Sequence, residues 1–205
     1  MADDRATSGT QRLTAIPNPS LVELVDRASA GDAGAWDELV DRFAGMVWVV
    51  ARGHGLSSAD AADVSQTTWL RLVEHLDRIR EPERVGAWLA TTARHESMRV
   101  AKHASRTVPS SDDTVIDLRV ADVEDELPFM TSERDAQLWA VFRRLPTRCQ
   151  VLLRLLVADE PLSYRDLGEA LEMPVGSIGP TRARCLEQLR RLGEEAGMSL
   201  TGESG

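Results

Sequence analysis

The stretch SYRDLGEALEMPVGSIGPTRARCLEQLRRL, residues 163–192, predicts two short helices around a turn. Ser163 can cap the first helix, and Pro174 and Gly176 mark the turn. The inward positions of the first helix are Leu167, Ala170 and Leu171. This pattern is typical of a helix-turn-helix, whose second helix places its N-terminal residues against base edges in the major groove. Any three-helix bundle gives a similar pattern, so the stretch alone leaves both interpretations open.

Within this stretch, GSIGPT puts glycine and proline where the second helix should run. With Ser177 as N-cap, Pro180 falls in the first turn, where backbone N–H groups lack intrahelical partners anyway. The apolar stripe is then expected to hold Ile178, Cys185, Leu186, Leu189 and Leu192. The opposite side holds Ser177, Pro180, Thr181, Arg184, Gln188 and Arg191. Arg182 falls on the apolar stripe, where it either reaches out to a phosphate or pairs with a carboxylate.

The rest of the chain also follows helical periodicity, without strand alternation or repeats. Ser20 is a candidate N-cap for the first helix, and Ser57 or Ser58 caps the third. Pro82 lies close to the first turn of the fourth. The expected helix bounds beyond the second helix are 59–79, 83–103, 132–144, 147–157, 163–171 and 177–193. We therefore expect an all-α protein.

Charge is unevenly distributed along the 205 residues, although the net charge is −9. Nine acidic residues and two arginines lie between Ser110 and Asp135, whereas nine arginines and six acidic residues lie between Arg143 and Leu192. The acidic segment predicts a flexible linker between two small helical domains. The expected division is a disordered tail (1–19), a first domain (20–107), the linker (108–131), a helix-turn-helix domain (132–193) and a second tail (194–205).

The third helix carries a mixed patch opposite its core stripe. At 100° per residue, Leu70 falls well away from the buried positions Trp69, Leu72 and Leu76. Its neighbours on the outward face are Asp63, Gln66, Thr67 and Glu74. A single outward leucine is common on protein surfaces, so this patch is either an ordinary exposed face or a partner site.

The fourth helix has a basic face opposite the expected core positions Val85, Leu89, Ala93 and Val100. That face holds Thr91, Arg94, His95, Met98, Arg99, Lys102 and Arg106, with Trp88 at its edge. Cations neutralise phosphates, and aromatic or apolar groups stack on unpaired bases, so the face suits nucleic acid. A solvated charged face is the competing interpretation.

Several classes of function are disfavoured by what the sequence lacks. The histidines do not have metal-ligand spacing, and neither a Gly-rich phosphate loop nor a nucleophile motif occurs, so we expect no enzyme, metal or cofactor. Cys149 and Cys185 form no CxxC motif, which favours buried free thiols over a disulfide framework or redox switch. The acidic N-terminus is no signal peptide, and no apolar run is long enough to span a membrane, so we expect a cytoplasmic protein without membrane insertion.

The order of these features resembles the extracytoplasmic-function (group IV) sigma factors of the sigma-70 family. DAADVSQTTWLRLVEHLDRI, VGAWLATTARHESMRVAKHASR, the acidic linker and the helix-turn-helix carry the resemblance, over roughly residues 20–107 and 132–193. It implies a region 2-like domain and a region 4-like domain. Arginine outnumbers lysine strongly, which favours a high-GC, actinobacterial source.

The resemblance implies a role for each surface. The patch Asp63, Gln66, Thr67, Leu70 and Glu74 would contact the β′ clamp helices of core RNA polymerase. The basic face Trp88, Thr91, Arg94, His95, Met98, Arg99, Lys102 and Arg106 would bind the melted −10 strand, with IREPERV as the loop that captures a flipped base. The residues Ser163, Tyr164, Arg165, Ser177, Pro180, Thr181, Arg182, Arg184 and Gln188 would bind the −35 duplex, near the β flap.

Some positions depart from the family's pattern. Many members carry Glu, Asn and Asp where Thr67, His95 and Arg99 stand, so the −10 preference is left open. Members often have Leu where Arg182 stands, and Lys and Arg where Gly179 and Thr181 stand.

The resemblance favours a promoter-specificity subunit that recruits core polymerase, reads two DNA elements and assists promoter melting. An anti-sigma protein is a further candidate partner, although the sequence identifies none. The alternative is a helix-turn-helix repressor or activator that acts on duplex DNA without polymerase.

Overall fold

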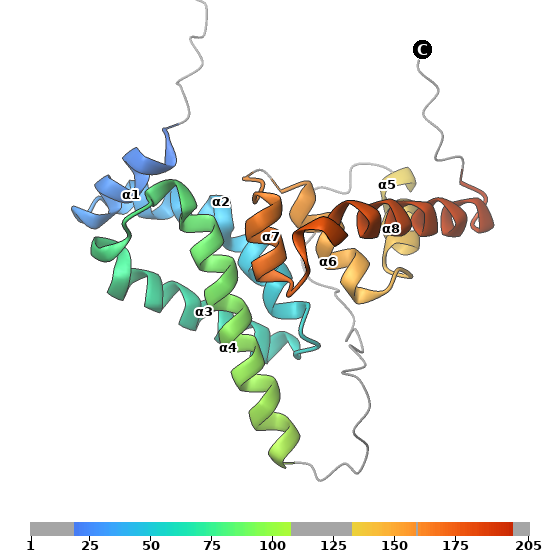
Figure 1. Cartoon of the computed structure of the whole chain (residues 1–205), viewed down its shortest axis with the longest axis horizontal. Helices are drawn as coiled ribbons and strands as arrows, with labels where there is room; N and C mark the ends of the chain where they lie inside the picture. The colour runs from blue at the N-terminus through green and yellow to red at the C-terminus, as the bar shows by residue number, and fades with distance from the viewer. Residues whose placement is uncertain (1–18, 108–132, 159, 199–205) are drawn as a thin grey trace, which may run out of the picture.

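The computed structural model describes residues 19–107, 133–158 and 160–198, and these residues form α-helices and short 3-10 helices without any strand (Figure 1). The predicted all-α class is therefore confirmed. The predicted linker (108–131) and almost all of the N-terminal tail (1–19) lie outside the described residues.

The N-terminal helix group contains four α-helices joined by short turns. They are α1 (Leu21–Ser29), α2 (Ala33–Arg52), α3 (Ser58–His75) and α4 (Val85–Thr107), and 3-10 turns at Leu76–Arg78 and Pro82–Arg84 connect α3 to α4. Ser20 caps α1 in a capping box, since its hydroxyl accepts from the Glu23 N–H at 3.2 Å and the Glu23 carboxylate accepts from the Ser20 N–H at 2.9 Å. Ser57, rather than Ser58, caps α3.

The C-terminal helix group contains α5 (Glu133–Phe142), α6 (Thr147–Leu156), α7 (Tyr164–Ala170) and α8 (Val175–Glu195). Ser163 caps α7 as predicted, because its hydroxyl accepts from the Asp166 N–H at 3.2 Å. The tail predicted from residue 194 is wrong at its start, since α8 runs to Glu195 and Met198 is buried.

The predicted start of α8 at Ser177 is also wrong. Pro174, in extended conformation, is the N-cap, and the helix begins at Val175. Ser177 lies in the first turn, where its N–H and its hydroxyl both donate to the Pro174 carbonyl, at 2.8 and 2.7 Å. Pro180 therefore stands inside α8 rather than among its first three residues, and it leaves the Gly176 carbonyl without its usual helical donor.

The turn between α7 and α8 depends on two unusual backbone positions. A Cβ atom at Gly168 would lie 2.7 Å from the Met173 carbonyl oxygen, so only glycine lets the chain approach so closely. Glu172 has a φ of 51°, a left-handed conformation that is uncommon outside glycine and asparagine. The helix-turn-helix is thus tightly closed at this corner.

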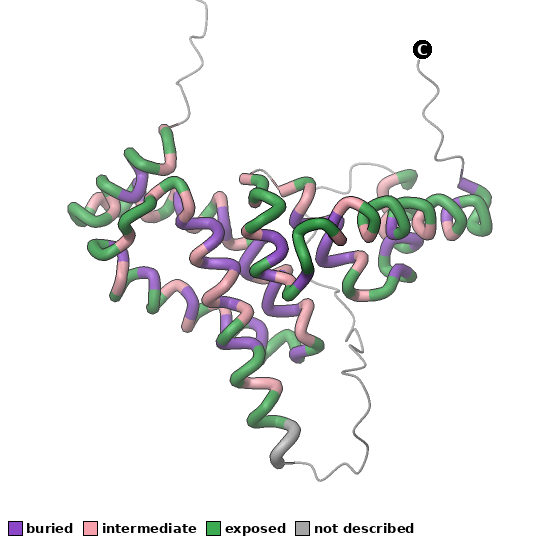
Figure 2. The backbone as a smooth tube through the Cα atoms, viewed as in Figure 1, coloured by how far each residue is buried: buried purple, intermediate pink, exposed green. Residues whose placement is uncertain are grey.

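The two helix groups share one hydrophobic core. Figure 1 shows α7 beside α4, and the helices of the two groups are in contact as the pairs α4–α7 and α2–α6. Leu152 of α6 and Leu167 of α7 are fully buried in the same cluster as Phe43 of α2 and Leu89 of α4. Figure 2 shows buried segments on the N-terminal helices and also on α6 and α7.

Candidate nucleic-acid and polymerase interface

The outward face of α3 exposes two large apolar side chains. Leu70 is 57% exposed, as predicted, and Val73 is 58% exposed beside it. Asp63, Gln66 and Glu74 are exposed and Thr67 is half-buried. We call these six residues the α3 patch. Sequence reasoning missed Val73, although at 100° per residue it lies only 60° from Leu70.

The opposite face of α3 holds the helix against its neighbours. Leu72 is fully buried, and the Trp69 ring meets Trp36 of α2 edge to face, with centroids 6.1 Å apart. The buried Thr68 hydroxyl donates to the Val64 carbonyl at 2.8 Å. These contacts fix the rotation of α3 and so keep the α3 patch directed away from the core.

The residues predicted for the basic face of α4 differ in how far they are exposed. His95, Met98, Arg99 and Lys102 are exposed, while Trp88, Thr91 and Arg94 are half-buried. The side chain of Arg106 lies outside the described side chains. Arg99 donates to the Glu96 carboxylate at 2.8 Å, yet its side chain stays 68% exposed. The exposed members are accessible to a nucleic-acid strand.

Arg94 differs because it is engaged by the C-terminal helix group. Its side chain is only 12% exposed and forms an ion pair with Glu172 of the α7–α8 turn. It also lies 2.8 Å from the His95 Nε2 atom. His54 lines the same 270 Å³ cavity as Arg94 and Glu172, and burial, followed by repulsion from Arg94, lowers the pKa of its imidazole. Arg94 is thus withheld from solvent in this arrangement.

The corner between α3 and α4 forms one side of an open cavity of 360 Å³, which Glu169 of α7 also lines. Its lining includes His75, Ile79 and Arg80, and Trp88 and Thr91 from α4. The rings of His75 and Trp88 lie 6.1 Å apart. The cavity therefore combines aromatic surface with cations beside the basic face, where the resemblance places the IREPERV loop.

The N-terminal half of α8 presents a polar surface. Pro180, Arg182 and Arg184 are exposed, and Ser177, Thr181 and Gln188 are half-buried. Arg184 donates to the Thr181 hydroxyl at 3.2 Å. Ser163, Tyr164 and Arg165 are exposed at the start of α7.

The predicted apolar stripe of α8 needs a correction. Ile178 and Cys185 are buried, but Leu186 is 43% exposed and Arg182 is exposed beside it. The buried stripe is narrower than expected, and the main packing partners of α8 are α5, α6 and α7. The alternative in which Arg182 pairs within the core is therefore excluded, since its side chain faces solvent.

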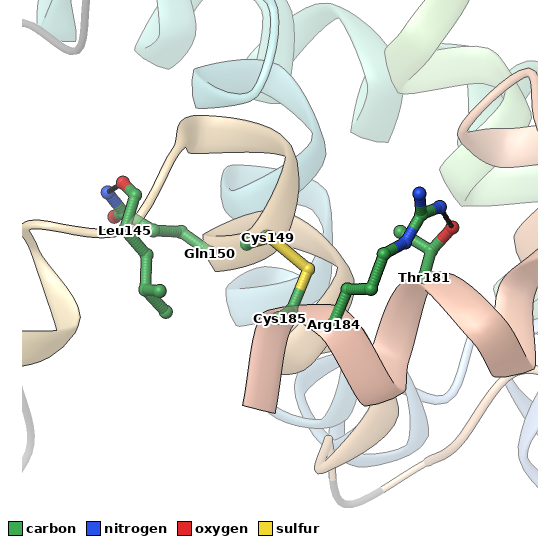
Figure 3. Close-up of a disulfide and its surroundings, with 6 residues drawn as sticks. All are labelled: Leu145, Cys149, Gln150, Thr181, Arg184 and Cys185. Carbon is green, nitrogen blue, oxygen red and sulfur yellow. Dashed lines mark hydrogen bonds between the residues drawn. A yellow bond between two sulfur atoms is a disulfide. The ribbon is translucent and has the colours of Figure 1, made fainter. Parts of the chain in front are cut away.

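The expectation of free thiols is wrong. Cys149 of α6 and Cys185 of α8 form a disulfide, with Cα atoms 5.4 Å apart (Figure 3). The close-up also shows Gln150, whose buried amide donates to the Leu145 carbonyl at 2.8 Å, and Arg184, which neighbours the disulfide. The spacing of 36 residues carries no disulfide signature, and only the packing of α6 against α8 brings the sulfurs together.

The described residues contain no cluster of three or more His, Cys, Asp or Glu side chains that could hold a metal ion. Within the same ranges, no helix is long and apolar enough to cross a membrane.

Residues 39–107 match the family model described as sigma-70 region 2. This chain is similar to the ECF RNA polymerase sigma factor BldN of Streptomyces coelicolor, with 28% identity over 175 residues, covering 84% of this chain and 65% of BldN. It is also 24% identical over 174 residues to the ECF RNA polymerase sigma-E factor of Haemophilus influenzae, covering 81% of this chain and 91% of that protein.

Among solved structures, the fold is similar to the sigma factor RpoE from Bartonella quintana, which was solved in complex with the anti-sigma factor NepR. The TM-score is 0.53 at 20% identity, and the match covers 77% of this chain and 97% of that one. The matched region 2 segment contains the whole of α3 and α4, so it includes both the α3 patch and the basic face.

Proposed function

This chain belongs to the extracytoplasmic-function group of the sigma-70 family of RNA polymerase sigma factors, and we propose that it directs core polymerase to promoters through three separate surfaces. The observation that carries the proposal is the region 2 match, which spans the helices that expose the α3 patch and the basic face of α4. The proposed division is a region 2-like domain at 20–107 and a region 4-like domain at 132–193.

The α3 patch is the proposed contact with the β′ clamp helices. Two adjacent apolar side chains, Leu70 and Val73, are more than half exposed and are bordered by Asp63, Gln66 and Glu74. Apolar anchors surrounded by polar groups are typical of protein interfaces. The C-terminal helix group is the proposed contact with the β flap.

The basic face of α4 is the proposed site for the melted −10 strand. Arg99 and Lys102 are exposed where a phosphate backbone could pass, and Met98 on the same helix is 43% exposed. The 360 Å³ cavity beside Trp88 is large enough for one base, and its aromatic rings offer a stacking surface. Capture of one flipped base there would help to keep the strands apart.

The N-terminal half of α8 is the proposed reader of the −35 duplex. Arg184 and Arg182 face solvent next to Thr181 and Pro180, and Tyr164 and Arg165 stand at the start of α7. In a helix-turn-helix these two helix starts approach the groove and the flanking phosphates. This surface has fewer cations than the family pattern, which predicts a larger share of polar and apolar contacts in its binding energy.

The proposed protein catalyses no covalent reaction itself, because RNA synthesis belongs to the polymerase that it recruits. Its place of action is therefore the cytoplasm. An anti-sigma factor is a further proposed partner, supported by the complex in which the similar RpoE was solved.

The test combines polymerase binding with transcription. Purified chain is mixed with bacterial core polymerase, and co-elution is measured by gel filtration. Run-off transcription on fragmented genomic DNA of the source organism then shows whether the complex starts transcripts at defined positions. Both results are expected. Binding to duplex DNA without binding to polymerase would instead identify an ordinary helix-turn-helix regulator.

A further inference from the structure

A cavity of 270 Å³ lies where the end of α2, the middle of α4, the start of α6 and the turn between α7 and α8 meet. Its apolar wall includes Val50, Val151 and Leu171. Its polar lining consists of His54, Arg94, Arg148 and Glu172. Apolar walls with a few convergent polar groups are typical of small-molecule sites, whose volumes begin at roughly 300 Å³. We call this space the His54 cavity.

Positive charge dominates the polar lining of the His54 cavity. Its two arginines are charged at any physiological pH, and Glu172 is the one carboxylate among the lining residues. Glu172 is already paired with Arg94. Arg148 is exposed, and within the described ranges its side chain forms no ion pair. The cavity therefore has one cation in excess, which an anionic group could neutralise.

Two of the basic side chains also have hydrogen-bonding groups that the protein leaves unused. The Nε atom of Arg94 is buried and has no hydrogen-bond partner among the described residues. The imidazole of His54 is half-buried and makes no hydrogen bond in that part of the chain. Buried donors in proteins are nearly always paired with a protein group, a water or a ligand. Oxygen atoms of a ligand in the cavity could supply the missing acceptors.

We propose that the His54 cavity binds a small organic anion, with a phosphate or similar oxyanion against the three basic side chains and a compact apolar group against the apolar wall. Guanidinium groups suit this role because their fixed N–H donors match the geometry of oxyanions. Of the lining residues only Arg94 belongs also to a proposed DNA surface, and its side chain is only 12% exposed. The site is therefore an addition to the proposed function and does not depend on it.

Phenyl phosphate is a suitable probe, since it joins an oxyanion to one apolar ring. It is titrated into the full chain at constant pH while the histidine ring signals are followed by NMR. The chain has four histidines, so the His54 signal is the one that is lost in His54→Gln. Phenyl phosphate should shift this signal saturably, with a Kd of about 1 mM or below. It should also raise the pKa of His54, because a neighbouring anion favours the imidazolium.

The two halves of the probe separate the two parts of the site. Inorganic phosphate should bind about tenfold more weakly than phenyl phosphate, because it leaves the apolar wall in contact with water. Phenol, which lacks the charge, should not saturate the His54 signal. Saturation by phenol at the same concentrations as phenyl phosphate would overturn the assignment of an anion site.

Two pairs of variants test the lining residues. Arg148→Gln should weaken binding of phenyl phosphate by about tenfold, the loss expected for a hydrogen bond to a charged group. Arg143→Gln is its control, since this exposed arginine does not line the cavity. Glu172→Gln should strengthen binding by about two- to fivefold, because it removes the competing carboxylate. Glu195→Gln, which breaks an ion pair with Arg144 outside the cavity, should leave the affinity unchanged.

The Glu172 variant keeps the test decisive, because a gain in affinity cannot result from loss of folding. Equal affinities of the Arg148 and Arg143 variants would overturn the proposal, as would the absence of a saturable shift with phenyl phosphate. A nucleic-acid phosphate is the other source of the same chemistry. If a single-stranded oligonucleotide saturates the His54 signal and phenyl phosphate does not, the cavity belongs to the DNA surface and the proposal fails.

Discussion

The carboxylate of Glu96 on α4 lies 2.7 Å from the Nη2 atom of Arg71 on α3, and the same carboxylate accepts from Arg99 at 2.8 Å. Glu96 is almost fully buried, whereas both arginines are substantially exposed. The carboxylate thus ties α3 to α4 beneath the surface that carries the proposed DNA contacts.

Removal of the two arginines should therefore cost more stability than removal of the carboxylate. Glu96→Gln leaves guanidinium groups that water can solvate, and should lower the free energy of unfolding by about 1–2 kcal/mol. Arg71→Ala with Arg99→Ala leaves a buried carboxylate unpaired and should lower it further. Urea denaturation followed by circular dichroism measures both. Equal losses would contradict the idea that Glu96 depends on its two partners.

Leu70→Glu should weaken binding to core polymerase by about tenfold or more, because a carboxylate would be buried in an apolar contact. Val73→Glu should have a similar effect, although the sequence alone did not single out this residue. Neither variant should alter the melting temperature, since both side chains are exposed. The matched control is Val22→Glu, an exposed valine on α1. Unchanged affinity of the Leu70 variant in a quantitative pull-down would contradict the assignment of the α3 patch.

Arg184→Ala should weaken binding of the holoenzyme to promoter DNA. It should also make the slope of log binding constant against log salt concentration shallower by about one unit. Lys102→Ala should do the same from the α4 face. Arg190→Ala is the control, because Glu187 at 2.7 Å and Glu194 both bind that guanidinium, and Glu187 above all raises its pKa. Affinity is measured at several salt concentrations. Identical slopes for the Arg184 and Arg190 variants would exclude a phosphate contact at Arg184.

Reduction of the disulfide should destabilise the C-terminal helix group. Closing a loop over a separation of 36 residues stabilises a fold by about 3–4 kcal/mol in the chain-entropy description. Cys149→Ser and Cys185→Ser should each lower the melting temperature by the same amount, and the double variant should lose no more than either single one. Differential scanning calorimetry with and without reductant checks this. Additive losses would show that the cysteines do not act as a pair.

Mild acid should favour separation of the two helix groups. Burial, with repulsion from Arg94, lowers the pKa of His54 while the two helix groups are in contact, whereas Glu172 opposes this effect and Arg148 of α6 lines the same cavity. Because the pKa is lowered, the stabilisation is fully present above the ordinary value of about 6.5 and is lost as pH falls below it. Small-angle scattering at pH 7.5 and 5.5 should show expansion at the lower pH. His54→Gln should reduce that change, and an unchanged response would exclude His54 as its source.

Local signals in the sequence were sufficient for much of this architecture. Ser20 and Ser163 cap their helices as predicted, because a capping hydroxyl needs only the backbone of the next turn. Leu70 faces outward as its angular position requires. The start of α8 was misplaced because the prediction used the hydroxyl of Ser177 as its cap, whereas the helix begins directly after Pro174, whose fixed φ suits the position before a helix.

Contacts between distant segments could not be predicted in the same way. Cys149 and Cys185 meet only because α6 packs on α8, and no local spacing indicates this. The pairing of Arg94 with Glu172 joins residues 78 positions apart. Both are products of tertiary packing, so single-sequence periodicity, which describes one helix at a time, contains no information about them.

The left-handed backbone of Glu172 is unfavourable locally, but its side chain joins the two helix groups. A residue with a β-carbon costs roughly 1–2 kcal/mol in this conformation, yet this position also supplies the carboxylate that holds Arg94. Glu172→Gly would relieve the backbone and remove the carboxylate in one change. Such a variant should have a more stable turn between α7 and α8 and a weaker contact between the two helix groups. The turn would become more rigid while the two groups became freer to separate.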